Sequence, residues 1–269
     1  MNIPFVKAHA ALNDFLLTWA TEVPEVEDLP AIARAICHRK SGIGADGWMQ
    51  VRHGSGNAHG AIQLLNSDGS ASEISGNGTR CAAAMLVREG HAPAGHVTIR
   101  TGAGLKELEV KERDGNRFMF DMNMGKAKFP GEAKSMLKLS GGPREVTILN
   151  VGNPQCAVFV DSFDFDWRTL GAEIECHPHF PSRTNVSFVR LISPDRLEVR
   201  FYERGAGETQ SSGTGSTGAA AAARERGLIG DRVTVETSAG QLSIAWRNEE
   251  IYMTGPAELT AQGLFYWSA

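Results

Sequence analysis

Residues 75–84 read SGNGTRCAAA, and residues 211–223 read SSGTGSTGAAAAA. Each stretch joins a serine, a glycine-rich turn and a run of alanines, which is the pattern of a capped helix start. The helices are expected to end at Gly90 and Gly227, because glycine suits the left-handed backbone at a helix C-terminus. Two such helices, one in each half of the chain, decide the fold.

The sequence around these helices is repeated as well. Asn66 lies nine residues before Ser75 and Glu203 lies nine before Ser212, and an apolar-rich run precedes each. The strand-like segments VTIRTGAG and VTVETSAG follow the two helices. Agreement over roughly 40 residues per copy indicates an internal duplication of one supersecondary unit.

The rest of the chain is mostly strand-like. Strands are predicted in KELEVKE, RFMFDMNM, EVTIL, CAVFV, NVSFVRL and QLSIAW, because β-branched and aromatic residues fill these short runs. A further helix is predicted over residues 28–40, with Pro30 in its first turn. Ile32, Ala35 and Ile36 share a face of it. The chain is therefore expected to be α/β (α+β), with two pseudo-symmetric lobes, each a β-sheet wrapped around a central helix.

The 269 residues suffice for two domains of ordinary size. We expect the N-terminal lobe to comprise residues 1–119 with about residues 257–269, and the C-terminal lobe residues 120–256. No low-complexity linker separates them in the sequence, which favours closely packed lobes with a ligand cleft between them.

Composition limits the partners. The net charge is −4 and no basic run is present, which argues against nucleic acid and membrane as partners. Neither a signal peptide nor a membrane span is recognisable, so a cytoplasmic location and a small-molecule partner are expected. The four cysteines are expected to be reduced, buried thiols; they are Cys37, Cys81, Cys156 and Cys176.

Both helix starts are candidate anion sites. The first N–H groups of a helix have no acceptor within it and carry its positive dipole end, and glycine lets a ligand approach. The structural alternative is that Ser75 and Ser212 only cap helices. Neither turn has the Gly-Lys-Ser/Thr ending of a phosphate-binding loop or a dinucleotide-binding fingerprint. A carboxylate is therefore the expected anion.

With these motifs assembled, the chain resembles the diaminopimelate epimerases, cofactor-independent racemases of the proline-racemase type. The matching motifs are Asn13–Phe15, Gly42–Gly47, Asn66–Ser70, Gly76–Cys81, Gly152–Pro154, Ile174–His177, Thr184–Val186, Glu203–Thr209 and Gly213–Gly215. The resemblance implies inversion at an amino acid α-carbon without pyridoxal phosphate or another cofactor. It also implies a homodimer that serves the lysine and peptidoglycan pathway.

The resemblance also implies a site. Inversion needs one group to remove the α-proton and another to deliver a proton to the opposite face, and Ser75 and Ser212 stand at these two positions. Glu203 is the third catalytic candidate. Substrate contacts are expected from Asn13, Asn66, Asn153, Asn185, Glu203 and Arg204, and backbone donors to the α-carboxylate from Gly76, Asn77, Gly213 and Thr214. Arg204 suits a distal carboxylate.

The chain departs from the family at several positions. Family members carry cysteine at both acid-base positions, and a serine is a far weaker acid that needs a neighbouring base. Glu203 or Glu208 could supply that base. Gln155 replaces a family histidine and cannot titrate, and residues 10–12 replace a glycine-containing stretch.

Several functions remain open from the sequence. The first is diaminopimelate epimerase activity, and the second is another isomerase or a dehydratase that needs a base on one face only. The third is a catalytically silent amino-acid-binding protein. A serine hydrolase is excluded because neither serine lies in GxSxG. His177 and His179 beside Cys176 resemble a metal cluster, but the family histidine binds no metal, so no metal is expected.

Overall fold

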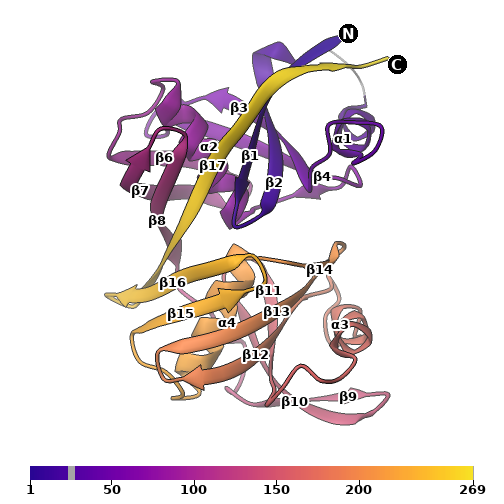
Figure 1. Ribbon diagram of the computed structural model, residues 1–269. Helices are drawn as coiled ribbons and strands as arrows, with labels where there is room; N and C mark the ends of the chain where they lie inside the picture. The colour runs from indigo at the N-terminus through magenta and orange to yellow at the C-terminus, as the bar shows by residue number, and fades with distance from the viewer. Residues whose placement is uncertain (24–27, 269) are drawn as a thin grey trace. The chain divides into compact units, whose positions relative to one another are not determined.

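The structure is a computed structural model that describes residues 1–23 and 28–268 (Figure 1). The chain divides into two compact units. Unit 1 comprises Met1–Met122 together with Gly255–Ala269, and unit 2 comprises Asn123–Thr254. Strands dominate both units, and each unit also contains helices, so the predicted mixed α and β fold with two lobes is confirmed.

Unit 1 is built on a mixed sheet. Its elements are β1 (Asn2–Ala10), β2 (Asn13–Trp19), a 3-10 helix (Ala20–Glu22), α1 (Leu29–Cys37), β3 (Gly47–His53), β4 (Gly60–Asn66), β5 (Ala71–Ser72), α2 (Gly76–Arg88), β6 (His96–Thr101), β7 (Gly104–Asp114) and most of β8 (Arg117–Gly125). Neighbouring strands follow the order β1, β2, β3, β4, β6, β7, β8. The pairs β2–β3 and β4–β6 are parallel, and the other pairs in this order are antiparallel.

Unit 2 is built in the same way. Its elements are β9 (Ser135–Leu139), β10 (Gly142–Asn150), β11 (Pro154–Phe159), α3 (Trp167–Glu175), β12 (Asn185–Ser193), β13 (Arg196–Glu203), β14 (Gly207–Thr209), α4 (Gly213–Glu225), β15 (Arg232–Thr237), β16 (Gly240–Arg247) and the start of β17 (Glu250–Tyr266). Neighbouring strands follow the order β10, β11, β12, β13, β15, β16, β17, and β11–β12 and β13–β15 are the parallel pairs.

The two sheets therefore repeat one pairing pattern. Strands β1, β2, β3, β4, β6, β7 and β8 correspond in order and direction to β10, β11, β12, β13, β15, β16 and β17. A short strand, β5 or β14, pairs with the strand that precedes the central helix in each unit. This repeat agrees with the duplication predicted from the sequence.

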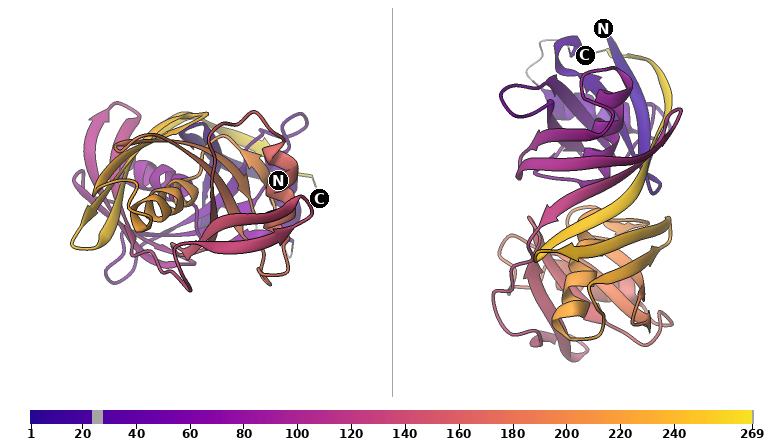
Figure 2. Two further views of the ribbon diagram at one scale, coloured as in Figure 1. Left: turned by 90° about the horizontal axis from the view of Figure 1, so that it is seen from below. Right: turned by 90° about the vertical axis from the view of Figure 1, so that its left-hand side faces the viewer.

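Each sheet surrounds one helix. Every residue of α2 from Gly76 to Val87 is buried, and so is every residue of α4 from Gly213 to Ala223. Alanine and glycine make up most of α4, and α2 carries two glycines and three consecutive alanines. These small residues let strands pack closely around the helices. The left-hand view of Figure 2 shows α4, the orange coil, with strands of its unit curving around it.

The predicted helix ends and most of the predicted buried face of α1 are confirmed. Gly90 and Gly227 have φ values of 78° and 70°, which confirms them as left-handed helix ends. Pro30 lies in the first turn of α1, and Ile32 is buried there. Ile36 is also buried, whereas Ala35 is only half-buried.

The cysteine prediction is correct except in one place. All four are free, and Cys37, Cys81 and Cys156 are buried. Cys176 is exposed, so the prediction of a buried thiol is wrong there. The reason is its position as the C-cap of α3, immediately after the last helical residue.

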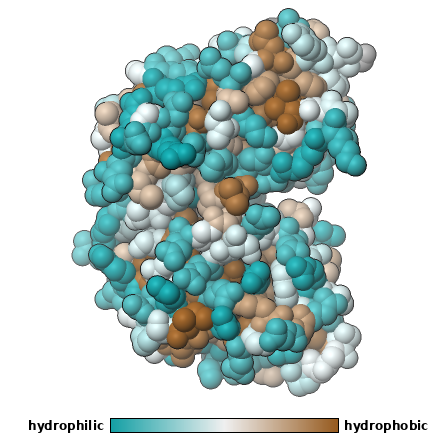
Figure 3. Space-filling view, in the orientation of Figure 1, coloured by the Kyte–Doolittle hydropathy of each residue, from teal (hydrophilic) through white to brown (hydrophobic). Residues whose placement is uncertain are grey.

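Hydrophilic side chains dominate the face of each unit that Figure 3 shows, and the hydrophobic ones are scattered. No helix in the described part of the chain is both long enough and apolar enough to cross a membrane.

Candidate active site

The N-terminal cluster is the set of predicted site residues in unit 1: Asn13, Asn66, Ser75, Gly76 and Asn77. Ser75 is the N-cap of α2, and its Oγ accepts a hydrogen bond from the Gly78 N–H at 3.0 Å. The N–H groups of Gly76 and Asn77 belong to the first turn and have no acceptor within the helix. Donation by these N–H groups to a bound anion stays a prediction.

Asn13 and Asn77 lie in one hydrogen-bonded chain. Asn77 Nδ2 donates to Asn13 Oδ1 at 3.2 Å, and Asn13 Nδ2 donates to Asp46 Oδ2 at 2.7 Å. On the other side, Asn77 Oδ1 accepts from Arg80 Nη2 at 2.6 Å. Arg80 is fully buried, and burial lowers the pKa of its guanidinium to about 10. Both carboxamides are thereby fixed in orientation.

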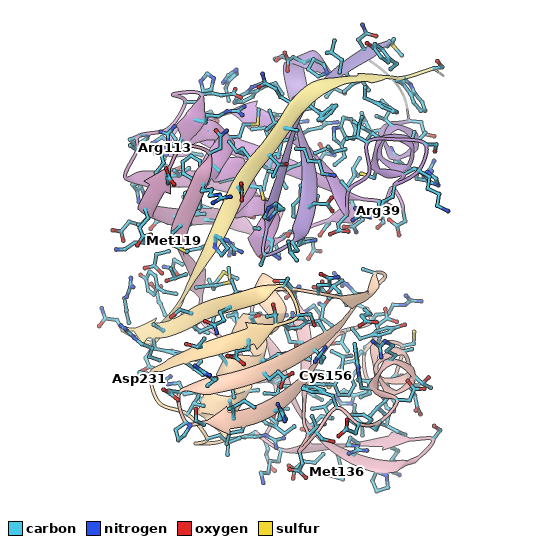
Figure 4. All side chains as sticks on the ribbon, viewed as in Figure 1. Arg39, Arg113, Met119, Met136, Cys156 and Asp231 are labelled. Atoms are coloured by element: carbon cyan, nitrogen blue, oxygen red, sulfur yellow. The ribbon has the colours of Figure 1, made fainter. Side chains whose placement is uncertain are left out.

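Asp46 is anchored in turn by a group of charges next to it. Arg39, labelled beside α1 in Figure 4, donates to Asp46 at 2.7 Å and to both oxygens of Asp14 at 2.8 and 3.2 Å. Lys7 lies 2.9 Å from Asp14. Burial would raise the pKa of Asp14, but hydrogen bonds from Arg39 and Lys7 outweigh it and lower that pKa overall. Sequence reasoning missed this support, because its members come from four separate segments.

Asn66 has a different kind of partner. It is the last residue of β4, and its Nδ2 donates to Ser70 Oγ at 2.9 Å. Ser70 Oγ in turn donates to Asp68 Oδ1 at 2.6 Å. Among the described residues of unit 1, no carboxylate accepts a hydrogen bond from Ser75.

The C-terminal cluster is the corresponding set in unit 2: Asn153, Asn185, Glu203, Arg204, Ser212, Gly213 and Thr214. Ser212 is the N-cap of α4 and accepts from the Gly215 N–H at 3.0 Å. Its own Oγ–H donates to Glu203 Oε1 at 2.6 Å. Thr209 Oγ1 donates to the other oxygen, Glu203 Oε2, at 2.7 Å. This serine therefore has the neighbouring base that serine chemistry requires.

Asn153 contacts the start of α4 as Asn13 contacts the start of α2. Its Nδ2 lies 3.3 Å from Thr214 Oγ1, and its Oδ1 accepts from Gln155 Nε2 at 2.8 Å. Thr214 and Asn77 each follow their capping serine by two residues. Gln155 is 1% exposed, and its Oε1 has no hydrogen-bond partner among the described residues.

Asn185 holds the backbone that carries Arg204. Its Oδ1 accepts from the Arg204 N–H at 3.1 Å, and its Nδ2 donates to the Pro154 carbonyl at 2.9 Å. The Arg204 side chain donates to the Ser182 carbonyl at 3.3 Å. The next residue is fixed by Glu175, whose Oε1 accepts from the Gly205 N–H at 3.2 Å. Glu175 is a supporting residue that sequence reasoning did not identify.

The sequence left Glu203 and Glu208 as alternative bases for a serine, and the structure distinguishes them. Glu208 forms a two-point ion pair with Arg168, with distances of 2.5 and 2.9 Å. Both side chains of that pair are exposed. Glu203 is the acid at a capping serine. Thr209, its second hydrogen-bond donor, was missed although it lies within the quoted motif Glu203–Thr209.

Cys81 and Cys156 are buried thiols, which are less reactive than exposed thiolates. Burial raises the pKa of Cys81 to about 12 and also raises the pKa of Cys156, which Figure 4 labels among the strands of unit 2. Cys176 donates to Glu175 Oε2 at 2.8 Å, and this hydrogen bond raises its pKa. Within the described residues, no group of three or more His, Cys, Asp or Glu side chains is suited to hold a metal ion.

Comparison with known proteins identifies relatives along the whole chain. A family model described as diaminopimelate epimerase matches residues 5–130 and 147–260. The diaminopimelate epimerase of Archaeoglobus fulgidus is 40% identical over 98% of this chain and 96% of its own length. That of Pelotomaculum thermopropionicum is 36% identical over 96% of this chain and 97% of its own length.

Solved structures share the fold at much lower identity. A hydroxyproline epimerase from Agrobacterium vitis with bound trans-4-hydroxy-L-proline has a TM-score of 0.77 and 17% identity, covering 98% of this chain and 92% of that one. A phenazine biosynthesis protein of the PhzF family from Bacillus anthracis has a TM-score of 0.72 and 15% identity, covering 98% and 99%. At these identities the likeness concerns the fold alone.

Proposed function

The chain belongs to the diaminopimelate epimerase family, and from this premise we propose that it inverts an α-carbon of diaminopimelate, interconverting the LL and meso isomers. Its enzyme class is that of its relatives, an isomerase. The observation that carries the proposal is the repeated construction of the two clusters. In each unit a serine caps a buried helix, and an asparagine contacts the residue two positions after that serine.

The proposed chemistry assigns one serine to each face of the substrate carbon. Ser75 and Ser212 exchange protons with the α-carbon from opposite sides. Negative charge then develops on the α-carboxylate, where the N–H groups of Gly76 and Asn77 stabilise it. Gly213 and Thr214 supply the equivalent N–H groups from unit 2. The proposal requires both clusters to act on one substrate molecule, and the expected ligand cleft stays a prediction.

Other members of the clusters are proposed to bind the substrate. Arg204 would pair with the distal carboxylate, and Asn185 supports this role because it fixes the Arg204 backbone. The remaining amides proposed as substrate contacts are Asn13, Asn66 and Asn153. The hydrogen bonds of Asn13 and Asn153 leave their orientation fixed before substrate arrives, which lowers the cost of ordering them.

Several finer features are proposed from the family. They are catalysis without pyridoxal phosphate, a homodimer, a cytoplasmic location, and a place in lysine and peptidoglycan synthesis. We also propose that Ser75 and Ser212 replace cysteines that other members use as acid and base. Inversion should then be slow, since a serine hydroxyl is a much weaker acid than a thiol.

One observation favours a second candidate, an isomerase or dehydratase of the same fold that needs a base on one face only. Glu203 accepts the Ser212 proton, whereas the Ser75 hydroxyl donates to no carboxylate among the described residues of its unit. A catalytically silent amino-acid-binding protein is the third candidate.

The test is incubation of the protein with LL- or meso-diaminopimelate in deuterium oxide. We expect inversion, followed by chiral chromatography, and loss of the α-proton signal in NMR spectra. Calorimetry measures binding in the same samples. Binding without any α-proton exchange or inversion would support only the third candidate, the catalytically silent binding protein. Absence of binding would contradict all three candidates.

A further inference from the structure

One buried polar side chain of unit 2 has an apolar counterpart in unit 1. Asn13 and Asn153 occupy equivalent places, because each contacts the residue two positions after a capping serine. Two residues further along the chain stand Phe15 in unit 1 and Gln155 in unit 2. The strand register agrees, since Phe15 pairs with the first residue of β3 and Gln155 with the first residue of β12. One strand position is thus filled by an aromatic ring in unit 1 and by a carboxamide in unit 2.

The fold itself does not require a polar group at this position. Phe15 is 3% exposed and Gln155 is 1% exposed, so both side chains lie in the interior. A buried carboxamide costs free energy unless its hydrogen bonds are made, whereas a phenyl ring has no such requirement. A polar side chain at position 155 therefore indicates a role other than packing.

The Gln155 carboxamide has a partner at its nitrogen but not at its oxygen. Its Nε2 donates to Asn153 Oδ1 at 2.8 Å. Asn153 Nδ2 is directed at Thr214 Oγ1, 3.3 Å away, so Asn153 presents its oxygen to Gln155. Gln155 Oε1 is left as an acceptor that has no hydrogen-bond partner among the described residues. Because it belongs to the same carboxamide, this oxygen lies beside Asn153, a proposed substrate contact.

Helix α4 leaves space for this side chain. An added Cβ on Gly218, inside the helix, would lie 3.1 Å from Gln155 Cγ and 3.3 Å from Gln155 Cβ. Glycine in a helix interior is less favourable than alanine, so this close approach reduces the stability of the helix. Gln155 therefore packs against the helix whose first turn is proposed to bind the α-carboxylate.

Diaminopimelate can supply the missing donor in only one way. At neutral pH its carboxylates only accept hydrogen bonds, so its ammonium groups are its polar donors. The α-ammonium is attached to the same carbon as the α-carboxylate, for which Gly213 and Thr214 are the proposed donors in unit 2. An acceptor beside Asn153, which itself contacts Thr214, is thus suited to the α-ammonium.

We propose that Gln155 Oε1 accepts a hydrogen bond from the α-ammonium group of the substrate, which makes Gln155 a specificity-determining residue for α-amino acids. This inference rests on the proposed function. A ligand without that ammonium group would leave Oε1 buried and without a donor, and a buried polar group left unpaired is a strong basis for discrimination.

The test compares substrate binding with stability in one variant. Gln155→Met keeps the length of the side chain and removes both polar atoms. We expect the dissociation constant for meso-diaminopimelate, measured by calorimetry, to rise about tenfold or more, as for loss of a hydrogen bond to a charged group. The thermal midpoint should not fall, because an unpaired oxygen leaves the interior and the half-buried Asn153 can bind water instead. Unchanged affinity would overturn the inference, and so would weaker binding together with a lower thermal midpoint, which would assign Gln155 a structural role.

Gln50→Met is the matched control. Gln50 is also a buried glutamine, in β3 of unit 1, and it belongs to neither cluster. We expect this variant to bind diaminopimelate as the unmodified protein does. An equal loss of affinity in both variants would overturn the assignment, because it would reflect the removal of any buried carboxamide.

A ligand without ammonium groups tests the contact itself. Pimelate has the same carbon chain and the same two carboxylates, and its affinity is measured by displacement of diaminopimelate. We expect Gln155→Met to reduce the preference for diaminopimelate over pimelate by about tenfold or more. An unchanged preference would show that Gln155 contacts no ammonium group.

A second variant keeps the inference testable if Gln155→Met fails to fold. Gln155→Glu retains the size of the side chain and an acceptor oxygen, and its negative charge attracts an ammonium group more strongly. The preference for diaminopimelate over pimelate should then rise, and an unchanged or lower preference would contradict the inference. The unmodified protein separates the two proposals: failure to bind diaminopimelate would contradict the proposed function, whereas equal binding by the unmodified protein and Gln155→Met would contradict only this inference.

Discussion

In the proposed mechanism, serine at positions 75 and 212 limits the rate of inversion. A thiol has a pKa of about 8.5 and is partly ionised at neutral pH, whereas an alcohol stays protonated unless a base removes its proton. Ser212 has such a base in Glu203, at 2.6 Å. Ser75 has the Gly78 N–H as a donor to its oxygen, which stabilises an alkoxide but does not generate one.

Placing a thiol at both positions should therefore accelerate the proposed inversion. We expect the double variant Ser75→Cys with Ser212→Cys to invert diaminopimelate at least about a hundredfold faster than the unmodified protein, the usual range for a competent acid-base group. Initial rates by chiral chromatography measure this effect. The single variant Ser75→Cys is the informative control, since it supplies a titratable group on the side that lacks a base. A double variant as slow as the unmodified protein would place the limitation at Gln155 or in substrate binding.

At the scale of elements, α3 depends on a close approach to β13. An added Cβ on Gly171 would lie 2.8 Å from Tyr202 Cβ and 2.9 Å from its Cγ, distances that real side chains do not adopt. Gly171 is buried in the middle of α3, so the helix would have to move away from the strand.

Gly171→Ala is accordingly expected to destabilise the protein. Overpacking costs about 1–3 kcal/mol, and the better helix propensity of alanine returns about 1 kcal/mol. A net loss of about 1 kcal/mol in the free energy of unfolding should appear in urea titrations. Ala172→Gly in the same helix is the control for the opposite change in helix propensity at a half-buried position. A gain in stability for Gly171→Ala would show that α3 has room to adjust.

Helices whose ends are marked by nearby residues could be predicted from the sequence. Strands whose extended form depends on pairing with distant strands could not. The helices α2 and α4 have a capping serine at one end and glycine at the other, so both ends are set within a few residues of sequence. Strand β17 contains Gly255, Pro256 and Gly263 and has few β-branched residues, so its sequence gives a weak strand signal. Its extended form is supplied by pairing with β1 and β16.

The same distinction applies to the candidate site. Glu203 and Ser212 are nine residues apart, and their pairing was already one of the two options that the sequence left for a base. The contact between Asn13 and Asn77 spans 64 residues, and the anchoring of Asn13 by Asp46 requires β2 and β3 to be placed side by side. No local pattern specifies such contacts, because they depend on strand order.

At the scale of the whole molecule, unit 1 depends on the last segment of the chain. From Gly255 onward β17 supplies the pairing partners of β1 and the buried residues Ala257 and Leu259. The Pro256 carbonyl accepts from Arg80 Nε at 3.1 Å, and the Arg80 side chain is fully buried. Removal of this carbonyl would leave a buried guanidinium short of an acceptor, which is costly in a low-dielectric interior.

Deletion of residues 255–269 should therefore unfold unit 1 selectively. We expect amide hydrogen exchange to show loss of protection in β1 and β2, with protection retained in β11, β12 and α4. Unit 2 keeps its pairing of β16 with β17 in this variant, since that ladder ends at Thr254. Unchanged protection of β1 would contradict the dependence.

The discontinuity of unit 1 also bears on how the protein is made. Its first 122 residues leave the ribosome early, but the strand that completes its sheet follows only after the whole of unit 2. At about 5–20 residues per second, the intervening segment of about 130 residues takes on the order of 10 s to synthesise. Unit 2 is contiguous and can fold during that interval. Until β17 is synthesised, β1 lacks this pairing partner and is an unpaired edge of the nascent N-terminal sheet. This unpaired edge is the expected site of chaperone binding or of aggregation during synthesis.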